Sequence, residues 1–142
     1  MKIYADTSFL LALYSPDANS AAAAQTMRSS AGEIYVTVLG ELEVVNAMRL
    51  RVFRKELSES QVQSSLDDFG KDMRTGILQL RPLPAQVFER ADYLSREATA
   101  RRGARTAELL HLAAAIELGV DGLYSFDRRQ LDLARGLGLT TN

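Results

Sequence analysis

Short strand-like runs alternate with longer helical segments along the whole chain, and this alternation constrains the fold more than any other feature. The strand-like runs are rich in branched and aromatic residues and are bounded by Gly, Pro or charged residues. Each is short enough to be a buried strand of a parallel sheet. They cover residues 3–5, 33–38, 78–83, 122–126 and 138–141.

Helical segments fill the intervals between these runs. Ser58 is a suitable N-cap, Pro84 can begin a helix, and Gly119 can end one. The predicted helices span residues 9–14, 17–30, 39–57, 58–75, 84–102, 106–119 and 128–135. Strands and helices that alternate in this way favour right-handed crossovers and a parallel sheet with helices on both faces. The sequence therefore predicts an α/β fold of three layers (α/β/α) with a central parallel sheet of about five strands.

Length and composition indicate one soluble globular domain, residues 1–142. The chain has 46% hydrophobic and 25% charged residues and no cysteine, which excludes disulfides and thiolate chemistry. Asp6 interrupts any signal-peptide core, and no apolar run has membrane-spanning length, so we expect a cytoplasmic protein without a membrane role. The formal net charge is -1, so any contact with nucleic acid must come from a local basic surface.

Two aspartates stand at the ends of predicted strands. Asp6 follows the run IYA, and Asp127 follows GLYSF. Ligands of such sheets bind at the carboxyl ends of the strands, near the point where the strand order reverses. Either aspartate alone could be a helix N-cap, but the two together favour a binding site at this edge of the sheet.

Two glutamates lie in helical segments with apolar surroundings. Glu108 belongs to ELLHLAAAI, which is apolar on nearly every face and is expected to be buried. Glu43 belongs to VLGELEVVNAM, where Glu41 is the alternative. A buried carboxylate is costly without a partner, and no lysine lies near these acids in the sequence, so a shared cation is one solution and solvated surface charge is the other. Oxygen-only ligands favour Mg²⁺ or Mn²⁺, and such clusters serve phosphoryl transfer to an activated water.

Three stretches carry a resemblance to a known family. They are KIYADTS at the amino end, ELEVVNAMR in the middle, and RTAELLHLAAAIELGVDGLYSFDRRQLDLARGLGL near the carboxyl end. In order and spacing they resemble the motifs of PIN-domain ribonucleases, specifically the VapC toxins of VapBC toxin–antitoxin pairs. The resemblance extends over essentially the whole chain, and the last stretch is its most specific part.

The resemblance implies a metal-dependent endoribonuclease on a compact α/β/α fold. One acid from each motif would hold Mg²⁺ or Mn²⁺, which activates a water for attack on an RNA phosphodiester. Glu43 fits the family pattern better than Glu41, because a small residue, Ala47, follows it four positions later. The residues carried over as catalytic and metal-binding are Asp6, Glu43, Glu108 and Asp127.

Hydroxyl and basic residues beside these acids are candidates for substrate contact. The resemblance assigns Thr7, Ser8 and Ser125 to hydroxyl positions that bind water or phosphate, with helix capping and turn bonding as the alternative. Among the arginines that flank the motifs, Arg105 and Arg128 are closest in sequence to the proposed ligands and are expected to guide the RNA backbone.

The resemblance also implies partners. We expect a homodimer and a VapB-like antitoxin, whose helical segment would lie in an apolar groove and could send a basic side chain to the acidic pocket. Residues 8–30 and 39–57 are apolar enough to line that groove, although core packing explains their composition equally well.

One departure from the family pattern concerns Glu108, where the family usually has aspartate. The extra methylene could move the carboxylate outward by roughly 1.5 Å, one bond length. A PIN-like domain that has lost its chemistry and acts as a protein- or RNA-binding module is therefore the alternative function. His111, the only histidine, is expected to be a packed, hydrogen-bonded residue rather than a ligand or base.

Overall fold

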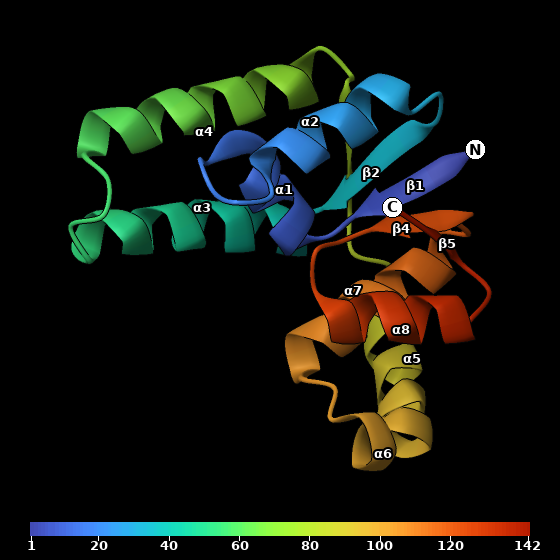
Figure 1. Ribbon diagram of the computed structural model, residues 1–142. Helices are drawn as coiled ribbons and strands as arrows, with labels where there is room; N and C mark the ends of the chain where they lie inside the picture. Colours follow the sequence, from blue (N-terminus) through green and yellow to red (C-terminus); the bar gives the residue numbers. More distant parts are fainter.

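The structure, a computed structural model, describes residues 1–142 and confirms the predicted α/β/α fold (Figure 1). Strands and helices alternate from the first strand to the last. The strands are β1 (Lys2–Ala5), β2 (Glu33–Thr37), β3 (Leu78–Arg81), β4 (Gly122–Tyr124) and β5 (Thr140–Thr141). The helices are α1 (Thr7–Tyr14), α2 (Ser20–Ser29), α3 (Val38–Phe53), α4 (Glu59–Arg74), α5 (Val87–Leu94), α6 (Ala100–Arg102), α7 (Thr106–Glu117) and α8 (Arg128–Gly136), with a π-helical turn, Ser95–Thr99, between α5 and α6.

The five strands form one parallel sheet in the order β3-β2-β1-β4-β5. The register places Tyr4 of β1 beside Tyr35 of β2 and Leu123 of β4. The chain first builds outward from β1 through β2 to β3, and then returns to the other side of β1 with β4 and β5. The order therefore reverses between β1 and β4, and the loops that follow these two strands are where such a sheet binds ligands.

The sheet separates two apolar cores because successive side chains of a strand point to opposite faces. Ile3 and Ala5 pack with α1, α2, α3 and α4 on one face. Tyr4 and Leu123 pack with α5, α7 and α8 on the other. Figure 1 shows the two groups of helices on opposite sides of the sheet. Since β1 is buried between both cores, the backbone at its carboxyl end is held firmly in place.

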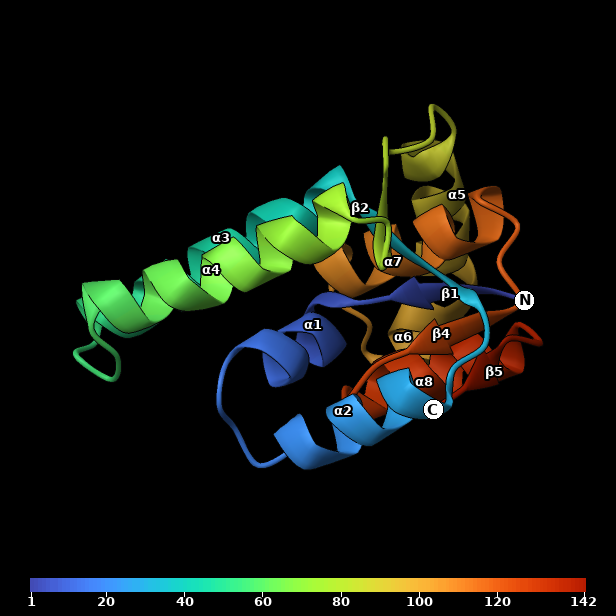
Figure 2. The same ribbon diagram turned by 90° about the horizontal axis from the view of Figure 1, so that it is seen from above.

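Helices α3 and α4 extend side by side beyond the sheet as an antiparallel arm (Figures 1 and 2). The second helix begins at the predicted N-cap, Ser58, which forms a reciprocal capping box with Gln61. The hydroxyl of Tyr14, at the end of α1, donates a 2.6 Å hydrogen bond to Asp72 of α4 and so attaches the arm to the rest of the molecule. No helix of the structure is both long and apolar enough to cross a membrane.

Some boundaries differ from the prediction because side-chain caps begin the helices earlier or end the strands sooner. Val38 belongs to α3 rather than to β2, since the Thr37 hydroxyl caps that helix. The strand predicted for residues 122–126 ends at Tyr124, because the next residues turn into the site described below. The helix predicted for residues 84–102 begins at Val87 and contains the π-helical turn, and it ends at Gly103, whose φ of 69° favours glycine.

Candidate active site

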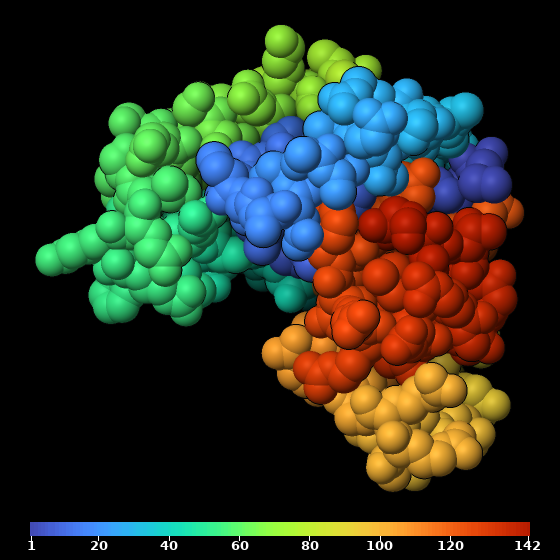
Figure 3. Space-filling view, viewed as in Figure 1, coloured from blue at the N-terminus to red at the C-terminus, as the bar shows by residue number.

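A pocket of about 340 Å³ lies at the carboxyl ends of β1 and β4, where the strand order reverses. Figure 3 shows a notch on this side of the molecule, between the α3–α4 arm and the orange segment near residue 100. The pocket draws residues from both sides of that notch and from the end of β1. Its lining consists of Asp6, Thr7, Ser8, Leu11, Glu43, Arg105, Ala107, Glu108, His111, Asp127 and Gln130. All four acids carried over from the family motifs therefore line one pocket.

Asp6 is the deepest of these acids, with a relative exposure of 4%. Its Oδ1 caps α1 by accepting from the Phe9 backbone N–H at 3.0 Å and also accepts from Ser8 Oγ at 2.7 Å. Its Oδ2 accepts from Ser125 Oγ at 2.5 Å. Burial raises the pKa of Asp6, and the three hydrogen bonds offset this only in part. The carboxylate is thus held in a fixed direction by neutral donors, without an arginine or lysine partner.

The Ser8 and Ser125 hydroxyls join the loops after β1 and β4. Each donates its hydrogen to Asp6, and the two oxygens lie 3.2 Å apart. Each also accepts a backbone N–H from the loop after β4, that of Phe126 in one case and that of Asp127 in the other. These contacts are the turn bonding that the sequence left open as an alternative, and they place Asp6 and Asp127 beside each other.

Glu43, on α3, enters the pocket from the arm side. Its Oε1 accepts a 2.9 Å hydrogen bond from Thr7 Oγ1 and a short one from His111 Nε2. Burial alone would raise the pKa of Glu43, but the bonds from His111 and Thr7 outweigh it and lower the pKa. Its Oε2 has no hydrogen-bond partner in the protein. The neighbouring Glu41, the alternative in the sequence, does not line the pocket.

Glu108 lies at the start of α7 and is buried, as expected. Its Oε2 accepts the Arg105 backbone N–H at 2.8 Å, and its Oε1 accepts from Arg105 Nε at 3.0 Å and Nη2 at 2.9 Å. The sequence-based assumption that this acid lacks a basic partner was therefore wrong, because an arginine three residues earlier reaches it within one helical turn. The longer side chain of glutamate is what allows the carboxylate to turn back to its own helix terminus.

Asp127 caps α8 by accepting the Gln130 backbone N–H at 3.1 Å with Oδ1. Its Oδ2 lies 3.6 Å from Arg105 Nη2, so Arg105 bridges Asp127 and Glu108. Arg129 Nη2 lies 3.6 Å from Glu108 Oε1 and adds a second positive charge. The pocket thus has one half whose acids are held by hydroxyls and a histidine, and another half whose acids are neutralised by arginines.

Gln130, on α8, is a member of the pocket lining that the sequence did not single out for a role. It is 1% exposed, and neither polar atom of its side-chain amide has a hydrogen-bond partner. Buried amide groups are normally paired, so an orphaned amide beside an acidic pocket is the kind of group that a bound ligand can satisfy. Its position in RRQ, directly after the aspartate motif, was the only available signal.

The donor set fits a hard divalent cation, although the side chains are not yet arranged around one position. All four acids offer oxygen ligands, which Mg²⁺ and Mn²⁺ prefer. Asp6 is a buried carboxylate without a cation of its own, and Glu43 keeps one oxygen free. However, no group of three or more acidic, His or Cys side chains stands ready to hold a metal ion. Arg105 occupies the position between Glu108 and Asp127, so the acids of that half are satisfied without metal.

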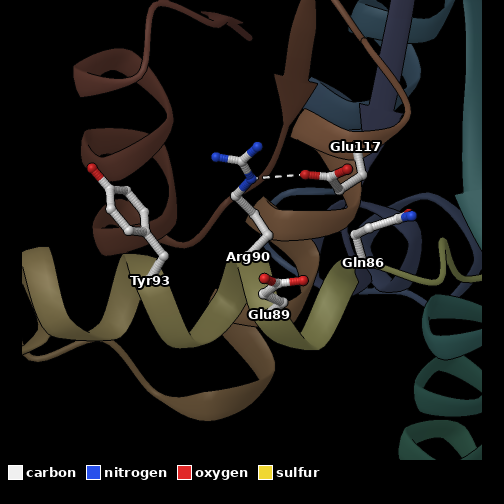
Figure 4. Close-up of a pocket in the computed structure, with 5 residues that line it drawn as sticks. All are labelled: Gln86, Glu89, Arg90, Tyr93 and Glu117. Atoms are coloured by element: carbon white, nitrogen blue, oxygen red, sulfur yellow. Dashed lines mark hydrogen bonds and ion pairs between the residues drawn. The ribbon is translucent and has the colours of Figure 1, made fainter.

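A second pocket lies on the outer side of α5 and α7, away from these acids (Figure 4). In it, Arg90 of α5 donates a 2.7 Å hydrogen bond to Glu117 of α7. This pair joins the two helices, and the pocket contains no arrangement comparable to the four acids. Glu117 and Glu108 therefore lie on the same helix and each pairs with an arginine of its own, Arg90 and Arg105, but their surroundings differ.

Comparison with known proteins adds a family to this geometry. The sequence model of the PIN domain matches residues 3–136, which include all four acids. No curated protein matches the sequence.

Solved structures of similar fold include VapC20, FitAcB and VapBC2. VapC20 of Mycobacterium tuberculosis, described as a toxin that cleaves the sarcin–ricin loop, has a TM-score of 0.71 at 16% identity, covering 97% of this chain and 96% of that one. FitAcB of Neisseria gonorrhoeae has a TM-score of 0.68 at 14% identity, covering 98% and 95%. VapBC2 of Rickettsia felis, bound to a DNA fragment from its promoter, has a TM-score of 0.66 at 17% identity, covering 100% and 98%. At such identities the likeness concerns the fold.

Proposed function

Since the chain belongs to the PIN domain family, we propose that it is a cytoplasmic, metal-dependent endoribonuclease of the VapC type, neutralised by a cognate antitoxin. The observation that carries the proposal is the buried Asp6 carboxylate at the reversal point of the sheet, beside three further acids. Burying a charge in this way is costly and persists where function requires it.

In this proposal Asp6, Glu43, Glu108 and Asp127 hold Mg²⁺ or Mn²⁺. The metal would supply an activated water and charge stabilisation at the RNA phosphodiester. Ser8 and Ser125 keep the Asp6 carboxylate in place, and Thr7 does the same for Glu43. Glu108 can turn toward a metal only when it releases Arg105, so metal binding and rearrangement of that arginine are coupled.

Substrate contact in the proposal falls to the exposed arginines at the mouth of the pocket. The Arg105 side chain is 69% exposed, so it can pass from Glu108 to a phosphate without a change of backbone. Arg128, the first residue of α8, is exposed and pairs with no acid. Phosphate contacts of this kind position an RNA without reading its sequence.

The test is RNA cleavage by the purified chain with Mn²⁺ or Mg²⁺. Asp6→Asn should abolish metal-dependent cleavage, whereas Asp132→Asn should leave it unchanged, because Asp132 is an exposed residue of α8 paired only with Arg135. Calorimetry should show Mn²⁺ binding to the native chain and a loss of binding in Asp6→Asn. Cleavage that persists in Asp6→Asn, or an absence of metal binding at millimolar ion, would refute the proposal.

The proposed function also implies partners. The solved toxin–antitoxin structures of similar fold support an antitoxin as partner. On α3, Leu42 and Phe53 are 65% and 82% exposed, which provides apolar surface for a helical segment. Co-purification from the native operon should yield a small partner protein, and light scattering should show a homodimer. A monomer at all concentrations would remove the dimer from the proposal.

A second candidate function, a binding module without catalysis, is favoured by one observation. Arg105 already neutralises Glu108 and Asp127, so half of the acidic pocket is satisfied without a metal. If the chain is such a module, it should bind RNA or a partner protein equally well with Mn²⁺ and with a chelator, and Asp6→Asn should not change that binding. An enzyme should instead respond to both changes.

A further inference from the structure

A continuous chain of buried hydrogen bonds leads to Glu43 from the opposite end of the site. Thr37 Oγ1 lies 2.9 Å from Tyr4 Oη, and Tyr4 Oη lies 2.7 Å from His111 Nδ1. The other imidazole nitrogen, Nε2, contacts Glu43 Oε1. The intermediate members of the chain, Tyr4 and His111, are buried, and their rings meet edge to face. Tyr4, Thr37 and His111 have no place in the chemistry described above.

The members of this chain come from four separate elements. Thr37 ends β2 and caps α3, Tyr4 is in the central strand β1, His111 is on α7, and Glu43 is on the second turn of α3. The series of hydrogen bonds therefore begins and ends at α3 but passes through the sheet and through α7. It fixes the Glu43 carboxylate relative to the strand that carries Asp6, and not only relative to its own helix.

The available hydrogens define which group donates and which accepts in each of these hydrogen bonds. Thr37 Oγ1 accepts the Gly40 backbone N–H at 3.4 Å, so its own hydrogen is available for Tyr4. An ordinary phenol is protonated at neutral pH, so Tyr4 keeps its hydrogen and can donate it to His111 Nδ1. The remaining imidazole hydrogen is then on Nε2, facing Glu43. In the reverse direction, the buried Thr37 hydroxyl would have no acceptor, which is unfavourable.

The two carboxylate oxygens of Glu43 therefore have different partners. Oε1 receives both the His111 and the Thr7 bonds, which leaves Oε2 without a protein partner and free for the pocket. We propose that His111 is a positioning residue for Glu43, and that Tyr4 and Thr37 select the imidazole nitrogen that donates to it. This proposal rests on the proposed function only in treating Glu43 as a metal ligand, since the hydrogen-bond chain itself needs no metal.

The first test uses the fact that His111 is the only histidine of the chain. Nitrogen-15 NMR of the metal-free protein at neutral pH can therefore assign the imidazole hydrogen without ambiguity. We expect the hydrogen on Nε2 and a bare Nδ1 in the native chain. Tyr4→Phe removes the donor to Nδ1 and should produce a mixture of the two tautomers. A hydrogen found on Nδ1 of the native chain, or a Tyr4→Phe spectrum identical to the native one, would overturn the proposal.

The second test separates positioning from packing by two amide substitutions. In His111→Gln the side-chain N–H can reach the place of Nε2 and still donate to Glu43. In His111→Asn the shorter amide reaches only the place of Nδ1 and leaves Glu43 Oε1 without that donor. Loss of such an orienting contact typically weakens metal binding about 10- to 100-fold. We therefore expect Mn²⁺ affinity, measured by calorimetry, to fall by that factor in His111→Asn and to be largely retained in His111→Gln.

Thermal unfolding of both variants is measured alongside the calorimetry. If His111 merely fills the core, the Mn²⁺ affinity of each variant should follow its thermal stability. Equal Mn²⁺ affinities in His111→Gln and His111→Asn would overturn the positioning role. If the native chain binds no Mn²⁺ at all, the metal site fails, and the tautomer measurement still decides the hydrogen-bond chain. The failure of the proposed function and the failure of this inference are thus distinguishable.

Discussion

Asp6→Asn is expected to stabilise the protein in the absence of metal. Burial raises the pKa of Asp6 more than the hydrogen bonds from Ser125, Phe9 and Ser8 lower it, so its ionised form opposes folding at neutral pH. Asparagine removes the charge, keeps the Oδ1 acceptor that caps α1, and offers an N–H to Ser125 Oγ. The same change should abolish the stabilisation by Mn²⁺ that we expect for the native chain.

The magnitude follows from the linkage between proton binding and stability. Each unit by which a pKa is raised on folding corresponds to about 1.4 kcal/mol. In a domain of 142 residues, 1 kcal/mol shifts Tm by about 3 °C, so each gain of about 1.4 kcal/mol from removing the Asp6 charge should raise the Tm of Asp6→Asn by about 4 °C relative to the native chain.

The pH dependence has a definite sign. Below the ordinary aspartate pKa of 3.8, Asp6 is protonated in both the folded and the unfolded chain, and its full contribution to stability is present. As the pH rises from there through the raised pKa of the folded state, the unfolded chain ionises first and this contribution is lost. The advantage of Asp6→Asn should therefore appear above this range and vanish below it.

Thermal melts between about pH 3.5 and 8, recorded with a chelator and with Mn²⁺, measure both effects. Asp127→Asn is the matched control, because Asp127 is also an N-cap but its side chain is 26% exposed and lies near Arg105. It should give no such stabilisation. A native chain that is more stable than Asp6→Asn at neutral pH without metal would refute the reasoning.

Three further predictions concern single side chains. Glu108→Gln should strongly reduce cleavage, whereas Glu108→Asp should keep or increase it. Glu108→Asp should also lose the hydrogen bond to the helix terminus, which is worth about 0.3–1.5 kcal/mol in unfolding free energy. Glu117→Gln is the control, and unchanged cleavage in Glu108→Gln would remove Glu108 from the site. Gln130→Met should raise the free energy of unfolding by about 1–3 kcal/mol in urea melts, because two orphaned polar atoms disappear, and a loss of stability would reveal a hidden partner. Tyr14→Phe should lower the same free energy by about 1.5–3 kcal/mol by removing the bond to Asp72, and an unchanged value would mean that the arm is held by other contacts.

The sequence predicted every strand and most helix positions because their signals are local. Alternation of apolar runs, the Ser58 cap and Gly119 are all visible within a few residues. The placement of Asp6 and Asp127 at one edge was predictable for a related reason, since parallel strands present their carboxyl ends together. The π-helical turn Ser95–Thr99 had no such signal within the segment predicted as one helix.

The contacts that organise the pocket depend on the tertiary fold and were largely beyond sequence reasoning. The bond between Tyr4 and His111 joins residues 107 positions apart, and no pattern within either segment indicates it. The pairing of Arg105 with Glu108 could have been found, because the two are three residues apart at the start of a helix. The sequence prediction assigns Arg105 to the RNA backbone instead.

The hydrogen bond from Ser125 to Asp6 also has a consequence for the synthesis of the protein on the ribosome. The two residues are 119 positions apart, and β4 must emerge before the loop that carries Ser125 can reach β1. At translation rates of about 5–20 residues per second, roughly 6 to 24 s separate the appearance of Asp6 from that of Ser125. During that interval a growing chain lacks half of its acidic pocket. Under the proposed function, the growing chain therefore cannot assemble its complete acidic pocket until β4 and the loop that follows it have been translated.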